Sequence, residues 1–295
     1  MAVIETNTKS SLHLRSNSLP SAPHPLVSQL EDNLQRLKSS EGACSASSSS
    51  VCNKLIGMQD LHDCIDNLLQ LPIEQQTLVQ ECNEKSVDDL LEGSLRILDI
   101  CSIAKDFLLI STESIHELQS IIRRRGNETG FTVEGAKYMA LRKSMKKQIR
   151  KALVNLKSMK NELISSSSNN KENNSSPMLQ SLKEAESITL NSLEHLLLFI
   201  SDPKGQSKNG RWSAISKLMH SKRVVCDFQE SDTNEFAKVD AALQPLISNK
   251  LTCTENVQSQ LENLEMCIQD LEIGVERMSR KLIRNRVSLL NIFNH

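Results

Sequence analysis

The most constraining feature of this sequence is an apolar repeat near its C-terminus. Its members follow one another in alternating steps of four and three residues: Val257, Leu261, Leu264, Ile268, Leu271, Val275, Met278 and Leu282. This spacing places them on one face of a helix and is typical of the seam of a coiled coil or an antiparallel bundle. We expect one helix from about Val257 to Leu290, the longest packed element of the chain.

The positions that flank this seam bear on oligomeric state. A dedicated zipper normally carries complementary charges there, whereas Gln260, Cys267 and Gly274 occupy one flank of this one. The pattern therefore favours packing within one chain over an intermolecular coiled coil. A monomer that buries the seam and a dimer that shares it both remain open.

Helical spacing of apolar residues also covers most of the remaining chain. It runs through Val27–Leu37, Leu55–Leu68, Leu91–Ile122, Tyr138–Leu163 and Leu182–Ile200. Pro72 and Pro177 suit the first turn of a helix, Ser86 and Thr132 are candidate caps, and Arg123–Gly126 is a strong helix end. Aromatic residues make up only 3% of the chain, which disfavours a large β-sandwich or barrel. The expected fold class is all-α, a helical bundle.

Composition shifts divide the chain into segments. Residues 1–25 are polar and proline-containing and are expected to form a disordered tail. A serine-rich loop is expected over Ser39–Ser50, and the Ser- and Asn-rich residues 165–176 read as a linker. The linker separates an N-terminal helical half, 26–164, from a C-terminal helical half, 177–295.

Charge and motif content exclude several functional classes. The net charge of −1 argues against a nucleic-acid binder. The sequence has no signal-peptide pattern and no apolar run of membrane-spanning length, so we expect a cytoplasmic protein. Its eight cysteines stand singly, which predicts reduced thiols and no metal site. Phosphate-loop, zinc-protease and nucleophile-elbow patterns are absent, and we expect no enzyme activity and no cofactor.

One predicted helix, Tyr138–Leu163, is strongly basic. Its cations crowd one flank of the apolar stripe: Lys137, Arg142, Lys143, Lys146, Lys147, Arg150, Lys151, Lys157 and Lys160. A basic amphipathic helix can bind an anionic membrane surface or an acidic partner. The contact residues predicted here are Lys143, Lys147, Arg150 and Lys151. The alternative is a solvated face balanced by acidic neighbours.

The tail carries a candidate phosphorylation motif. Arg15 lies three residues before Ser18, a spacing that suits a basophilic kinase, and Pro20 follows two residues later. Phosphate on Ser18 would add nearly two negative charges and three acceptor oxygens. Arginines of a phosphoserine-reading adaptor could then bind it.

Four stretches in order resemble a known family. They are RSNSLPSAPHPL (Arg15–Leu26), DLLEGSLRILDIC (Asp89–Cys101), LQSIIRRRG (Leu118–Gly126) and RKLIRNRVSLLNIFNH (Arg280–His295). Together they resemble a plant-specific family related to the Bypass-type proteins of root and shoot development. The resemblance implies an all-α intracellular plant protein with roles in organ development and signalling. It implies no activity, cofactor or site residue.

These observations lead to one functional expectation and one alternative. We expect a non-enzymatic interaction or regulatory protein of plant root and shoot development, with protein partners and control by phosphorylation of its tail. The alternative is a peripheral membrane protein that binds anionic lipid through the basic helix and a C-terminal cluster, Arg277, Arg280, Lys281, Arg284 and Arg286.

Overall fold

The computed structural model describes residues 24–40, 47–124, 128–169, 177–201, 234–248 and 254–294. Over these ranges the chain forms eight helices and no strand, which confirms the all-α prediction. The helices are α1 (Pro25–Ser40), α2 (Ser48–Leu69), α3 (Pro72–Glu81), α4 (Glu84–Arg123), α5 (Glu128–Asn169), α6 (Pro177–Ser201), α8 (Glu235–Ile247) and α9 (Thr254–Phe293). Residues 1–23 of the predicted tail, with Arg15, Ser18 and Pro20, lie outside the described residues, and Pro25, its predicted last residue, begins α1.

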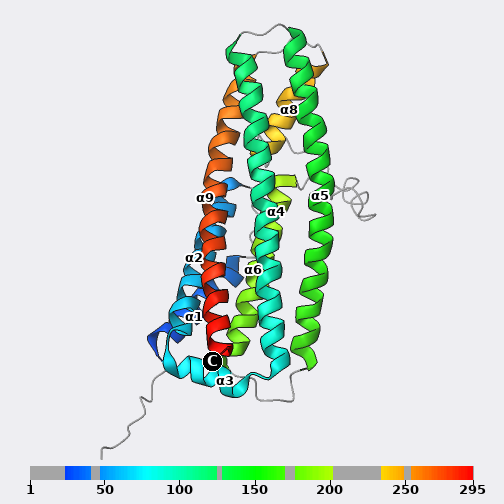
Figure 1. The fold of residues 1–295 in the computed structure, drawn as a ribbon. Coiled ribbons are helices and arrows are strands. Elements are labelled where there is room, and N and C mark those ends of the chain that lie inside the picture. Colours follow the sequence, from blue (N-terminus) through cyan, green and yellow to red (C-terminus); the bar gives the residue numbers. More distant parts are fainter. Residues whose placement is uncertain are drawn as a thin grey trace, which may run out of the picture.

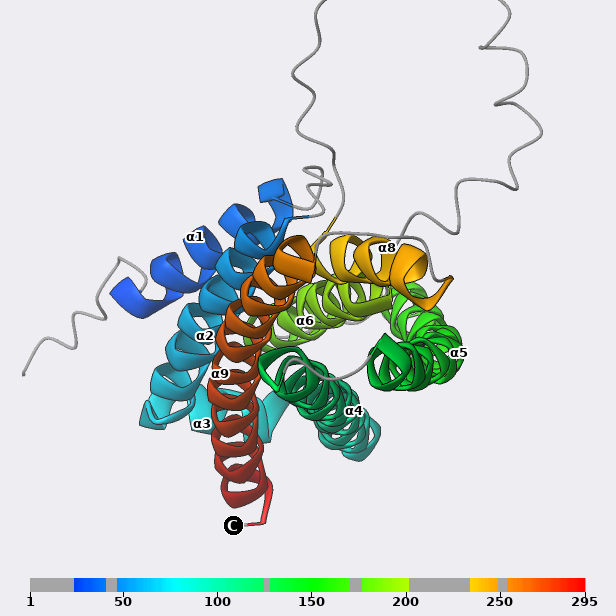
Figure 2. The same ribbon diagram turned by 90° about the horizontal axis from the view of Figure 1, so that it is seen from above.

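The long helices run alongside one another in an elongated bundle. Figure 1 shows α4, α5, α6 and α9 nearly parallel to the long axis, with the short α3 across one end. Seen from above in Figure 2, α1 and α5 lie at opposite edges of the bundle and α9 lies between α2 and α4. Helices from both sides of the predicted linker therefore share one core, since α9 packs on α2 and α4. The predicted start of that linker at residue 165 was wrong, because α5 continues through Asn169.

The seam of α9 forms the centre of that core. All eight residues from Val257 to Leu282 that keep the repeat are buried, as predicted. The repeat continues through Asn285, Leu289 and Ile292, which are also buried. Gly274 lets α2 approach closely, because a Cβ there would lie 2.9 Å from Leu55 Cδ1. Burial of this continuous apolar strip is the main force that attaches α9 to the bundle.

Several helix boundaries differ from the predicted ones. The cap of α4 is Asn83, whose Oδ1 accepts a hydrogen bond from the Ser86 amide (2.8 Å), so Ser86 lies inside the helix. Ser47 caps α2, and the predicted serine-rich loop therefore ends before Ser48. The start of α5 at Glu128 shows that the predicted cap at Thr132 was wrong. In each case an earlier residue begins the helix, and the same apolar face continues toward it.

Two further expectations about the elements need correction. The longest helix is α5, with 42 residues, whereas α9 has 40. Helix α8 was not predicted from the sequence at all. By contrast, Pro72 and Pro177 each begin a helix as predicted, because proline lacks only an amide that the first turn leaves unbonded. In the described part of the chain, no helix combines the length and apolar character needed to cross a membrane.

Candidate anion-binding groove

The basic helix α5 lies at one edge of the bundle and packs on α4, α6 and α8. Its buried face carries the predicted stripe members Tyr138, Met145, Ile149 and Leu156. Because successive residues are turned by about 100°, positions on the other side of the helix point outward. The four predicted contact residues, Lys143, Lys147, Arg150 and Lys151, are all exposed there.

The neighbouring helix α8 supplies an acid that sequence reasoning missed. Asn234 caps this helix, since its Oδ1 accepts from the Ala237 amide (2.8 Å) and its Nδ2 donates to the Phe199 carbonyl of α6 (2.6 Å). Phe236, Val239 and Leu243 then turn inward at helical spacing. The asparagine cap and this spacing were the available signals, and Pro245 near the end of the helix interrupts them. The helix brings Asp240 beside α5.

Arg142 is the most buried of the basic side chains on α5, with 2% of its side chain exposed. Its Nε donates to Asp240 Oδ1 (3.2 Å) and its Nη1 to the Ile200 carbonyl (2.9 Å). The guanidinium also lies over the Phe236 ring, 4.6 Å from the centroid. A buried cation is tolerated only when its charge and donors are satisfied in this way. Arg142 therefore joins α5, α6 and α8.

Asp240 has a second cationic partner. The Lys146 Nζ lies 2.9 Å from Asp240 Oδ2. One carboxylate therefore neutralises part of the charge of two cations, which leaves the site positive.

The surface beside these contacts is hollowed into a groove of about 380 Å³. Its lining consists of Met139, Arg142, Lys143, Lys146, Lys147, Arg150 and Asp240. Asp240 is the only acid among these seven residues, and it is already engaged. A groove with five cations and one anion attracts negative charge, and its concave shape focuses that field.

Three of the four predicted contact residues meet in this groove. Lys143, Lys147 and Arg150 line it, and Lys151 lies next to Arg150 on the exposed face. Over the described ranges, none of the four forms an ion pair or a side-chain hydrogen bond. Elsewhere on α5, Lys137 pairs with Glu134 and Lys160 with Glu194.

The C-terminal basic cluster is used differently. Arg280 pairs with Glu276 (2.9 Å), Arg284 with Asp66 (3.6 Å) and Lys281 with Asp63. Arg286 Nη1 donates to the Leu91 carbonyl and to Ser94 Oγ (2.7 Å). Most of this cluster therefore holds α9 against α2 and α4, unlike Lys143, Lys147 and Arg150 of the groove.

Three of the described histidines lie on three different helices. His62 is on α2, His116 on α4 and His195 on α6, and His220 lies outside the described residues. His116 contacts Glu265 (2.9 Å) at the surface, and His195 contacts Lys54. His62 is buried and contacts Thr189 of α6 and Asn285 of α9.

Comparison with known proteins identifies a family. A family model described as Protein BPS1 matches residues 54–292, a range that includes both helices of the groove. No curated protein matches the chain, and no solved structure matches it. The family match confirms the resemblance to Bypass-related proteins and implies involvement in plant development. Because the match spans most of its length, the chain belongs to the BPS1 family.

Proposed function

We propose that this protein is a non-enzymatic interaction protein of plant development that binds an acidic segment of a partner protein in the α5–α8 groove. The observation that carries the proposal is the set of unpaired cations Lys143, Lys147 and Arg150 beside an acid that Arg142 and Lys146 already engage. Exposed cations without intramolecular partners keep their charge available for another molecule. The concave shape of the groove fits an extended acidic chain.

A direct binding measurement tests this function. The quadruple variant Lys143→Gln, Lys147→Gln, Arg150→Gln and Lys151→Gln should bind a fluorescent glutamate-rich peptide about ten-fold more weakly, since each exposed pair contributes up to about 1 kcal/mol. Fluorescence anisotropy gives the Kd, and added salt should weaken binding by the wild type.

A matched variant controls for net charge. Arg36, Lys38, Lys105 and Arg280 are also exposed, but each pairs with an acid. Their simultaneous change to Gln removes the same number of positive charges and should leave peptide affinity nearly unchanged. Equal losses in both quadruple variants would contradict a specific groove.

Anionic lipid is the second candidate for the same face. Val154 is 69% exposed and lies one turn beyond Arg150 and Lys151 on α5, so an apolar side chain accompanies the cations. Flotation with phosphatidylcholine vesicles, with or without phosphatidylserine, separates the two candidates. Binding that requires phosphatidylserine and is lost in the groove variant would favour a peripheral membrane protein.

We further propose, from the sequence motif alone, that phosphorylation of Ser18 controls the interactions of this cytoplasmic protein. Arg15 and Pro20 complete the motif that a phosphoserine-reading adaptor would bind. Purification of wild-type and Ser18→Ala protein from plant tissue, with phosphosite mapping by mass spectrometry, tests this regulation. An unmodified Ser18, or the same partners for both proteins, would refute it.

A further inference from the structure

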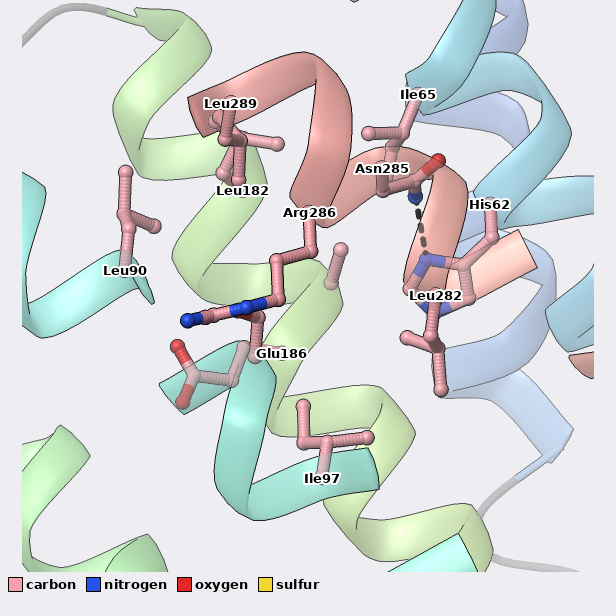
Figure 3. Close-up of a pocket in the computed structure, with 12 residues that line it drawn as sticks. His62, Ile65, Leu90, Ile97, Leu182, Glu186, Leu282, Asn285, Arg286 and Leu289 are labelled. Atoms are coloured by element: carbon pink, nitrogen blue, oxygen red, sulfur yellow. Dashed lines mark hydrogen bonds between the residues drawn. The ribbon is translucent and has the colours of Figure 1, made fainter. Parts of the chain in front are cut away.

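A second site lies inside the bundle, between α2, α4, α6 and α9. It is a cavity of about 50 Å³ whose walls are mainly aliphatic. The wall residues include Ile65, Leu90, Ile97, Leu182, Leu282 and Leu289 (Figure 3). At about 10–15 Å³ for each water-sized group, this volume holds about four such groups. An apolar chamber of that size fits a short branched alkyl group.

One end of the cavity carries two opposite charges. In Figure 3 the Glu186 carboxylate and the Arg286 guanidinium extend toward the same end of the pocket. Both side chains are partly exposed, so this end is nearest to solvent. Arg286 donates through Nη1 to α4, and its Nε and Nη2 make no hydrogen bond within the described residues. Its remaining donors are therefore available to an acceptor.

Glu186 has neither an ion pair nor a hydrogen bond with any described residue. It packs against Gly93 of α4, where a Cβ would lie only 2.2 Å from Glu186 Oε1. Burial raises the pKa of Glu186 to about 7, against the effect of nearby Lys183 and Arg96. A carboxylate desolvated to this extent gains from a cationic partner.

The opposite end of the cavity is uncharged. Thr189 Oγ1 donates to the Ala185 carbonyl (2.6 Å), so His62 Nε2 donates to Thr189 Oγ1 (3.0 Å). His62 Nδ1 then accepts from Asn285 Nδ2 (2.9 Å). Burial lowers the pKa of His62 to about 4, which keeps this chain of hydrogen-bonded side chains uncharged at neutral pH. Asn285 Oδ1 has no partner in the described chain.

We propose that this cavity binds a small aliphatic α-amino acid, with its side chain between the helices and its zwitterionic head at the Glu186–Arg286 end. The ammonium group would pair with Glu186 and the carboxylate with the free donors of Arg286. A ligand with one charge would satisfy only one of these groups and would meet the other as a like charge. This site shares no residue with the α5–α8 groove and does not depend on its function.

Titration of the full-length protein with L-leucine tests the proposal. Isoleucine and leucine methyl NMR signals report the location, and those of Ile65, Leu182 and Leu289 should shift in a saturable way while Ile164 of α5 should not. Two matched probes each lack one charge of leucine: isoamylamine and 4-methylpentanoate. Each should bind about ten-fold more weakly or worse, because a charged hydrogen bond contributes about 1.5–3 kcal/mol.

Variants then test the two charged residues. Glu186→Gln and Arg286→Gln should each weaken leucine binding about ten-fold. Because Arg286 also holds α4, Glu186→Gln is the decisive change, and Glu184→Gln on the same helix serves as its control. Glu184 pairs with Lys38 at the surface and should not affect leucine.

The pH dependence gives an independent check on Glu186. The charged and titratable groups around it are Lys183 on its own helix, Arg96 and Asp89 on α4, Arg286 on α9 and His62 on α2. Free leucine keeps both charges between pH 6 and 8, whereas the ionised fraction of Glu186 falls about ten-fold from pH 8 to 6. The leucine Kd should rise by a similar factor, and Glu186→Gln should abolish this dependence.

Several results would overturn the proposal. The cavity would not be a leucine site if leucine gave no saturable shift at the lining methyl groups. Equal affinity for leucine and either probe would exclude recognition of a zwitterion. Unchanged leucine affinity in Glu186→Gln would place any bound leucine elsewhere.

Discussion

Buried charge has a different role at each of the two polar sites. Arg142 is almost fully buried, but Asp240, the Ile200 carbonyl and the Phe236 ring satisfy it. Glu186 is partly buried and unpaired, and its pKa is raised to about 7. The contacts of Arg142 join helices, whereas the Glu186 carboxylate lacks the cation that would stabilise its charged form.

Loss of the Arg142 guanidinium should strongly destabilise the fold. Arg142→Met keeps most of the aliphatic stem but removes the main buried partner of Asp240, which should lower the free energy of unfolding by about 3 kcal/mol. Urea denaturation measures this change. Lys143→Met, one residue away and exposed, should change it by less than about 0.5 kcal/mol. Similar values for both variants would show that the Arg142 contacts do not stabilise the bundle.

The two perturbed groups of the cavity should affect stability with opposite signs as pH changes. The unfolded chain protonates His62 near pH 6.5 and the folded chain near 4, so between these values the His62 contribution to stability rises with pH. For Glu186 the folded chain holds its proton up to about pH 7 and the unfolded chain only to about 4.5, so this contribution falls as pH rises. Over the shared window the two contributions largely cancel.

Single variants should separate these contributions. In Glu186→Gln the free energy of unfolding should increase with pH across the shared window, relative to wild type, because the His62 contribution remains. In His62→Gln it should decrease relative to wild type. Across its full pH range, the contribution of each group changes the free energy of unfolding by about 3 kcal/mol. Urea denaturation at several pH values gives these slopes, and parallel curves for all three proteins would contradict the assignment.

At the scale of elements, shortening a side chain to alanine should affect the free energy of unfolding differently on the two faces of α9. Leu271 is fully buried in the seam, whereas Ile273, two residues later, is 51% exposed. Leu271→Ala should lower the free energy of unfolding by about 3 kcal/mol, from lost transfer energy and the cavity left behind. Ile273→Ala should cost less than about 1 kcal/mol by the same measurement. Comparable losses would place the seam on the wrong face.

Helix existence was more predictable than helix boundaries. Apolar spacing is a property of neighbouring residues and was sufficient for α1, α2, α4, α5, α6 and α9. A boundary depends on which side chain first meets an unbonded amide, and in α4 that residue is Asn83 rather than Ser86. The short helix α8 escaped prediction because it contributes only Phe236, Val239 and Leu243 to the buried face.

At the scale of the whole molecule, one chain buries the entire predicted seam. Val257 through Leu282 contact α2, α4 and α8 of the same chain, so the repeat leaves no apolar strip that a second copy must cover. We therefore expect a monomer of 33.0 kDa whose mass does not change with concentration. Multi-angle light scattering over a wide concentration range checks this, and a dimer mass would indicate a further interface.

The candidate groove was predictable only in part. The sequence placed Lys143, Lys147, Arg150 and Lys151 on the outward flank of a helix, because helical periodicity decides which residues share a face. It did not show that Arg142, which belongs to the same basic run, is buried and paired with Asp240 of α8. Nor did it separate the groove from the C-terminal cluster, where Asp63 and Asp66 of α2 pair with Lys281 and Arg284.

The sequence by itself determined the helices, their buried faces and the family, because these depend on local periodicity and on recognisable stretches. Tertiary structure alone decided which charges are paired. Asp240 of α8 pairs with Arg142 of α5, 98 residues away, whereas Glu186 of α6 and Arg286 of α9 line one cavity without pairing with each other. Such contacts depend on how helices are arranged around a common core. Apolar spacing fixes which face of each helix turns inward, but it does not specify which helix lies opposite that face.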